Sequence, residues 1–323
     1  MSRMKNAMKN WKPIDIAELK TVSIKDRRSK VSLENLGKPW RNGESLSSFL
    51  SRLPDVLAAR DLKDIVSAIV TATKDSRPVI LAMGAHPIKV GLSPIIIDLM
   101  SRGIIHGVAL NGAGIIHDFE LAYAGKTSEV VEDVISDGSF GMTRETAEFL
   151  NTAIIKGKEK GLGLGESVGR EIHSSSFPNK DLSILAAGVK FDIPVTVHVA
   201  VGTDVIHIHP QADGAAIGEC SLRDFRIFAR LISKLEGGVY INLGSAVVLP
   251  EVFLKAISLV RNLGYRLDGF TTINMDFQRH YRPQVNVVSR PPGTSGKGYN
   301  LIGHHEIMFP LLAALVIEEL ESG

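Results

Sequence analysis

The hydrophobic positions of this chain fall into short continuous apolar runs that alternate with longer stretches of helical spacing. Pro78–Met83 is one such run, rich in Val, Ile and Leu, and a glycine-containing turn at residues 84–87 follows it. Val90–Met100 then has apolar residues at helical spacing, and Gly107–Leu110 is a second apolar run. Continuous apolar runs are typical of strands buried on both faces. The segment therefore predicts a strand, a crossover helix and a parallel strand, which form a βαβ unit.

The same alternation continues to the end of the chain. Further strands are predicted at Pro194–Val201, Val239–Leu243, Gly269–Asn274 and Val285–Val288. Helices are predicted at Leu46–Lys74, Glu129–Phe140, Thr143–Lys156, Leu182–Val189, Leu222–Leu235, Glu251–Leu263 and Glu306–Leu320. Strands that alternate with helices predict an α/β fold, a single doubly wound Rossmann-like domain with a mainly parallel sheet. We expect residues 1–75 to form an N-terminal arm and helix, and residues 76–323 to form the nucleotide-binding domain.

The glycine-rich segment Lys156–Gly165 contains the Gly-x-Gly spacing of dinucleotide-binding turns. It follows lysines and a glutamate rather than a buried strand, which is the context that such a turn requires. We therefore interpret it as a mobile loop.

Composition narrows the class of protein. The 323 residues are 44% hydrophobic and 22% charged, as in a soluble globular protein, and the formal net charge is +2. So small a charge does not favour nucleic acid or an anionic membrane as a partner. The single cysteine, Cys220, excludes an internal disulfide framework and a multi-cysteine metal site. The sequence shows neither an apolar run long enough to cross a membrane nor a signal-peptide core, so we expect a cytoplasmic protein.

The turns that follow the predicted strands are candidate ligand contacts, because open α/β sheets bind ligands outside the carboxyl ends of their strands. Helix N-termini at such turns favour phosphate groups, and Lys89 is a candidate partner for phosphate. The turn residues are Gly84, Ala85 and His86, then Asn111, Gly112, Ala113 and Gly114, and then Gly244, Ser245 and Ala246.

Seven segments occur in an order that resembles deoxyhypusine synthase, from about Pro78 to the C-terminus. They are ILAMGAHPIKVGL, ALNGAGIIHDFELAYAG, VGREI, FDIPVTVHVAVGTD, VYINLGSAVV, FTTINMDF and IMFPLLAALVIEEL. The resemblance implies an NAD-dependent Rossmann-type transferase that moves an aminobutyl group from spermidine to a lysine of a protein acceptor. It also implies a homotetramer, cofactor contacts at Asp204 and His304 besides the turns above, and Lys297 of Ser-Gly-Lys as the residue that forms an imine with the substrate.

The chain departs from that family where the substrate is held. Pro250 or Glu251 stands where the family has a catalytic histidine, and Ile116-His117 replaces an acidic pair, although Asp118 remains. The stretch that holds the polyamine in the family carries Arg279, Arg282 and Arg290 here. Because cations repel a polyamine, we expect a small-molecule amine substrate that is changed from spermidine, and an amine that also carries a carboxylate or phosphate would suit these arginines better.

Histidines supply the remaining candidates. His207 and His209 are two residues apart and would share one face of a strand. With Asp204, His117 and Asp118 they form either an acid–base wall, in which His117, Asp118 and His207 are catalytic, or a metal site on His207 and His209.

Three functions remain open from the sequence. The first is a deoxyhypusine synthase-like NAD-dependent transferase that works through an imine on Lys297. The second is a metal-dependent hydrolase that uses the His207 and His209 cluster. The third is a non-catalytic nucleotide-binding module.

Overall fold

The computed structural model describes residues 11–322, so residues 1–10 of the predicted arm lie outside the described residues. The chain divides into two units, Met1–Leu36 and Gly37–Gly323. The described part of the first unit has one short 3₁₀ helix, η2 (Leu33–Asn35), and its Trp11 side chain is exposed. All the strands and the long helices of the described chain, the N-terminal helix Leu57–Lys74 included, belong to the second unit.

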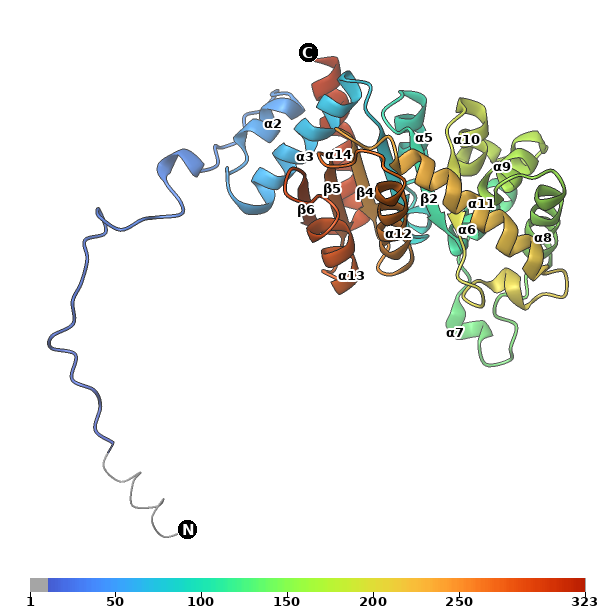
Figure 1. The fold of residues 1–323 in the computed structure, drawn as a ribbon, viewed down its shortest axis with the longest axis horizontal. Coiled ribbons are helices and arrows are strands. Elements are labelled where there is room, and N and C mark those ends of the chain that lie inside the picture. The colour runs from blue at the N-terminus through green and yellow to red at the C-terminus, as the bar shows by residue number, and fades with distance from the viewer. Residues whose placement is uncertain (1–10, 323) are drawn as a thin grey trace, which may run out of the picture. The chain divides into compact units, whose positions relative to one another are not determined.

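The second unit is built on one six-stranded sheet in which every pairing is parallel. The strand order is β3-β2-β1-β4-β5-β6, and Figure 1 labels four of these strands, β2, β4, β5 and β6. β1 pairs with β2 on one side and with β4 on the other, so the order reverses between β1 and β4. This arrangement confirms the predicted Rossmann-like α/β fold. The strands are β1 (Val79–Met83), β2 (Gly107–Asn111), β3 (Val195–His198), β4 (Val239–Leu243), β5 (Thr271–Asp276) and β6 (Lys297–Ile302).

Helices cover both faces of the sheet because successive strand residues point to opposite faces. Leu81 and Met83 of β1 join one core with helices α3, α5, α6, α10 and α14, whereas Ile80 and Ala82 join a second core with α11 and α12. The helices are α2 (Leu46–Arg52), α3 (Leu57–Lys74), α4 (His86–Lys89), α5 (Ser93–Ser101), α6 (Gly112–Ala124), α7 (Val131–Val134), α8 (Arg144–Glu159), α9 (Leu164–Ser174), α10 (Ile184–Phe191), α11 (Gly214–Ile232), α12 (Val248–Asn262), α13 (Tyr281–Pro283) and α14 (His305–Glu321). Short turns η3 (Lys180–Leu182), η4 (Val205–Ile208) and η5 (Gln284–Ser289) complete them. None of the described helices is long and apolar enough to cross a membrane.

The predicted strand Val285–Val288 is wrong, because this segment forms the π-helical turn η5. Val287 is fully buried in the core beneath α12. A helical turn therefore buries apolar residues whose pattern suggested a strand. The sixth strand is β6, which has a glycine and mostly half-exposed or exposed residues. It lies at the edge of the sheet, where one-sided burial allows polar residues.

The predicted mobile loop at Lys156–Gly165 is also wrong. Helix α8 continues to Glu159 and α9 begins at Leu164, so only a short turn separates them. A Cβ atom on Gly165 would lie 1.9 Å from the carbonyl oxygen of Val195 in β3. Glycine at this position therefore permits α9 to pack directly against the strand backbone.

The outer edge of β3 is closed by side chains from α11. The Asp224 carboxylate accepts hydrogen bonds from Val197 N (2.7 Å) and from Gly165 N at the start of α9 (2.9 Å). The Ser221 hydroxyl donates to Val197 O (3.0 Å) and accepts from Val199 N (3.1 Å). Burial raises the pKa of Asp224 to about 7, against the opposing effect of these amides. Asp224 thus joins the edge strand β3 to helix α9, and its burial there makes its carboxyl group harder to ionise.

We expect Asp224→Asn to remove part of the pH dependence of stability. A carboxyl with a raised pKa in the fold stabilises it below the unfolded value near 4, and this contribution is lost as pH rises through about 7. Asparagine keeps an acceptor oxygen and does not titrate. Urea unfolding measures the free energy of unfolding of both proteins. From pH 4 to pH 7.5, the value for the variant should rise relative to that of the native chain by on the order of 2–4 kcal/mol. The exposed Asp133→Asn serves as control, and equal pH profiles for Asp224→Asn and the native chain would contradict the argument.

Candidate functional site

The turns that leave β1 and β4 touch each other at the carboxyl edge of the sheet. Gly84 N donates to Leu243 O (3.1 Å), and Gly244 N donates to Met275 O (2.9 Å). A Cβ atom on Gly84 would lie 2.4 Å from the carbonyl oxygen of Gly244. Only glycine fits here, so the two backbones are in close contact at the point where the strand order reverses.

Two histidines meet above this contact. His86, the first residue of α4, is exposed, and His305, the first residue of α14, is buried. Their Nδ1 atoms are 2.9 Å apart, so one ring donates a hydrogen bond to the other. Gly244 has φ +62°, and a Cβ atom there would lie 2.6 Å from Cε1 of His305.

A buried carboxylate continues this line of polar groups. Asp276 ends β5, and its Oδ1 lies 3.9 Å from Nε2 of His305. Its Oδ2 lies 3.9 Å from Nε2 of His280, and Oδ1 also accepts from Phe277 N (2.8 Å). Burial lowers the pKa of His305, while the Asp276 carboxylate opposes that effect. A neutral His305 is therefore placed between a solvent-facing imidazole and a buried acid, which is an arrangement able to move a proton.

The sequence indicated only part of this group. It gave His86 as a turn residue, but Asp276 was missed because the predicted strand ended at Asn274. A buried strand that runs directly into an aspartate was the signal that could have found it.

A second polar pair lies at the carboxyl ends of β2 and β3. The Asn111 side chain caps α6 by accepting from Gly114 N (3.1 Å). Asp204 sits directly on the first residue of that helix, because a Cβ atom on Gly112 would lie 1.9 Å from its Oδ2. Oδ2 of Asp204 and Nε2 of His207 are 3.9 Å apart, and both are buried without a hydrogen-bond partner among the described residues. Burial raises the pKa of Asp204 to about 6 and lowers that of His207.

The prediction that His207 and His209 share one face of a strand is wrong. The segment is the 3₁₀ turn η4 rather than a strand, so the two rings have different neighbours. His207 Nδ1 accepts from Gly202 N (3.1 Å), whereas His209 Nε2 bonds to the carbonyl of Gly141 (2.8 Å). Within the described residues, no group of three or more His, Cys, Asp or Glu side chains is placed to hold a metal ion.

Asp118 and His117, predicted as catalytic, face different surroundings on α6. Asp118 is fully buried and accepts from the Ser183 hydroxyl and from Ile184 N (2.7 Å), so it caps the N-terminus of α10. His117 Nδ1 lies 2.6 Å from the Thr127 hydroxyl. Burial, and then the charge of Lys89, lower the pKa of His117 to about 4. Asp118 therefore helps to hold α10 in position. His117 and Lys89 lie near each other.

Lys297 does not join these residues within the chain. It is the first residue of β6 and pairs with Thr271 at the start of β5, so it lies at the amino edge of the sheet. Five strand steps of ~3.3 Å put it about 17 Å from the carboxyl edge. His304 is at the carboxyl edge, where its ring lies nearly parallel to that of Phe277 with centroids 6.5 Å apart.

Two arginines of the predicted cationic stretch have partners outside the histidine group. Arg282 pairs with Glu251 of α12 (3.4 Å), and Arg290 donates to the Asn286 side chain (3.3 Å). Arg279 is exposed. Glu251 thus partly neutralises the stretch.

No protein-family model matches this chain, and no curated protein matches it in sequence. Solved structures share its fold. The ternary complex of AgrE with ornithine and NAD+ has a TM-score of 0.53 at 13% identity, covering 81% of this chain and 33% of AgrE. A protein described as LOR/SDH from Methanococcus maripaludis S2 has a TM-score of 0.52 at 15% identity, covering 92% and 75% of the two chains. A protein described as a deoxyhypusine synthase from Entamoeba histolytica has a TM-score of 0.50 at 11% identity, covering 86% and 95%.

At these identities the similarity shows a shared fold. The chain spans about one third of the length of AgrE and also of ArgZ, an arginine dihydrolase from cyanobacteria. AgrE was solved with ornithine and NAD+, and this chain shares the fold of about one third of it.

Gly244→Ala should disturb the histidine pair more than its backbone conformation alone explains. Gly264 also has positive φ (+80°), but nothing lies within 4 Å of a Cβ atom there, so Gly264→Ala is a matched control. Each variant should lose about 1 kcal/mol through backbone strain. Gly244→Ala should lose about 1–3 kcal/mol more because the methyl group displaces the His305 ring. Chemical denaturation measures the difference, and equal losses would contradict the close contact.

Proposed function

We propose that this protein is an enzyme that binds a dinucleotide of the NAD type at the carboxyl edge of the sheet, across the β1–β4 switch point. The observation that carries the proposal is the line from exposed His86 through His305 to buried Asp276 at that point. A proton-transfer group at the switch point of a doubly wound sheet is where redox chemistry on a bound dinucleotide would need it. The fold shared with the NAD+ complex of AgrE supports the same cofactor.

The residues around the switch point fit such a cofactor. Asp204 Oδ2 is a buried acceptor without a partner among the described residues, and ribose hydroxyl groups are donors that an acidic residue binds in this fold. The N-termini of α6 and α12 follow β2 and β4, on either side of β1, and helix N-termini favour phosphate. Lys89 near His117 adds a positive charge beside α6.

One feature differs from common dinucleotide turns. The turn after β1 contains a single glycine, Gly84. Pro87 in α4 lacks an N–H group. We therefore assign phosphate binding to α6 and α12 rather than to the short helix after β1.

The hydrogen-bonding pattern defines the direction of proton transfer. If His86 donates from Nδ1 to His305 Nδ1, the Nε2 atom of His86 is free to accept a proton, and Nε2–H of His305 faces Asp276. When bound, the nicotinamide supplies the acceptor or donor for a hydride. His86 would take the proton that a hydroxyl or ammonium group of the substrate loses as its carbon is oxidised. His305 and the Asp276 carboxylate would then stabilise the imidazolium.

The resemblance to deoxyhypusine synthase implies a finer function, aminoalkyl transfer through an imine on Lys297. The order of the matching segments and the similar fold of the Entamoeba protein support it. The amino-edge position of Lys297 does not, because an imine on that lysine has to form where the oxidised substrate carbon is. Redox chemistry at His86 is therefore the function that the geometry supports best.

Calorimetric titration with NADH and with NAD+ tests the cofactor. We expect binding by the native chain, and about tenfold weaker binding by Asp204→Asn, because a charged acceptor for a ribose hydroxyl is replaced by a neutral one. The exposed Asp133→Asn should bind like the native chain.

Absence of heat with both nucleotides at millimolar concentration would overturn the cofactor assignment. Borohydride trapping with spermidine and NAD+ separates the two reaction types. Covalent labelling of Lys297, lost in Lys297→Ala, would establish the transferase reaction instead of the one proposed here.

A further inference from the structure

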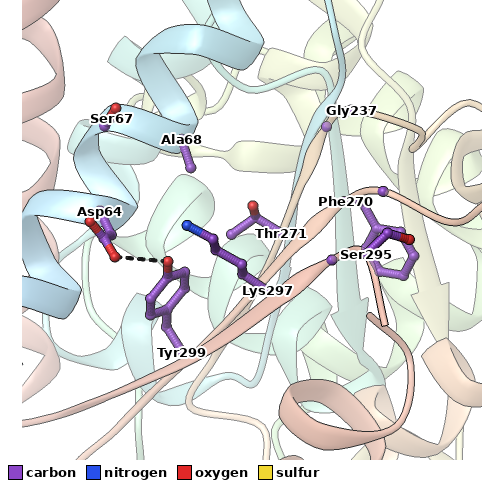
Figure 2. A pocket seen from close by; sticks show the side chains of 12 residues that line it. Asp64, Ser67, Ala68, Gly237, Phe270, Thr271, Ser295, Lys297 and Tyr299 are labelled. Carbon is purple, nitrogen blue, oxygen red and sulfur yellow. Dashed lines mark hydrogen bonds between the residues drawn. The ribbon is translucent and has the colours of Figure 1, made fainter. Parts of the chain in front are cut away.

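A separate cavity of about 340 Å³ lies at the amino edge of the sheet, far from the histidines. Figure 2 shows it between helix α3 and the first residues of β5 and β6, with the Lys297 side chain extending into it. Its volume is at the low end of the range for small-molecule pockets. A dinucleotide is too large for it, so its ligand has to be a smaller molecule.

Lys297 and Asp64, the charged side chains that line the cavity, do not form an ion pair with each other. Asp64 of α3 accepts a hydrogen bond from the Tyr299 hydroxyl (3.0 Å), as the dashed line in Figure 2 indicates. Lys297 has no ion-pair or side-chain hydrogen-bond partner in the part of the chain that the structure describes. Burial, together with Asp64, raises the pKa of Tyr299 to about 12, so its hydroxyl stays neutral. The cavity thus presents an unpaired ammonium group, which extends toward α3, and a carboxylate on α3 that Tyr299 holds in place.

Unused hydroxyl groups accompany these charges. Ser67 and Thr271 line the cavity, and their side chains have no hydrogen-bond partner among residues 11–322. In Figure 2 Thr271 lies beside the Lys297 side chain. The backbone amides nearby are already used, because Thr271 N donates to Gly238 O (3.0 Å) and Lys297 N to Phe270 O (3.2 Å). These two amides are therefore not available to a ligand.

Glycines keep the floor of the cavity bare. A Cβ atom on Gly238 would lie 2.4 Å from Pro78 O, and one on Gly296 would lie 2.5 Å from Phe270 O. The loop backbone packs too closely for any other residue at these two positions. The opening above them is thus a product of the fold and not of mobile side chains.

We propose that this amino-edge cavity binds a small zwitterion, an α-amino acid. Lys297 and Thr271 bind the carboxylate, and Asp64 with the Tyr299 hydroxyl binds the ammonium group. Lys297 is exposed and Asp64 is half-buried; a zwitterion offers each of them a group of opposite charge, whereas an ion of one sign offers a partner to only one. This site does not depend on the dinucleotide site, so each stands or fails by its own experiment.

Thermal unfolding with L-serine as the probe tests the proposal. At about ten times the dissociation constant, L-serine should raise the Tm of the native chain by about 2 °C or more. Ethanolamine lacks the carboxylate and L-lactate lacks the ammonium group, so each should raise Tm far less. Lys297→Met and Asp64→Asn should both abolish the shift, whereas Lys160→Met, a change at an exposed lysine that directly follows α8, should retain it.

Other outcomes would overturn the assignment. No shift with L-serine, or an equal shift in Lys297→Met, would exclude the cavity as its site. A shift with inorganic phosphate that is as large as that with serine, and is lost in Lys297→Met, would show an anion site instead. If Asp64→Asn fails to fold, Tyr299→Phe replaces it, because it removes the hydroxyl that holds Asp64 while keeping the ring, and an unchanged shift in it would contradict the ammonium contact.

Discussion

The close approach of Gly84 to the carbonyl of Gly244 is the constraint on which the carboxyl edge depends. A side chain at either position would push the exits of β1 and β4 apart or displace the His305 ring. Because the two glycines allow the backbones to touch, the starts of α4 and α14 come close enough for His86 and His305 to share a hydrogen bond. The polar line to Asp276 is therefore a consequence of backbone packing at the switch point, and its geometry is set before any ligand is considered.

The sequence predicted the fold well because each of the strands β1 to β5 contains a run of apolar residues that can be recognised locally. Pro78–Met83 and Val239–Leu243 are continuous apolar runs, and burial on both faces of a parallel sheet produces that pattern. β6 leaves no such signal, since a strand at the sheet edge keeps polar residues. Lys156–Gly165 misled for another reason: glycine serves both flexibility and close packing, and only the neighbouring strand reveals which one applies.

The candidate site was less predictable, because its contacts join distant parts of the chain. His86 and His305 are 219 residues apart, and no local pattern in either segment indicates the other. Lys297 shows the same limit in a different way. In a parallel sheet, whether a residue begins or ends a strand decides at which edge it lies, and a shift of a few residues in a strand boundary moves it across the whole sheet. Resemblance of segments in order cannot supply that information.

The side chains of α11 that cover β3 also bear on how this protein behaves among its own copies. An edge strand presents unpaired amides and carbonyls to which a strand of another molecule can add. Here Asp224 and Ser221 occupy the outward groups of Val197 and Val199, in the place that a neighbouring strand would take. The sheet therefore ends at β3 because its own helix completes the hydrogen bonding. A concentrated solution of the folded chain offers no template for strand addition at that edge, so protection from aggregation is built into the same contacts that hold α9 and α11 in place.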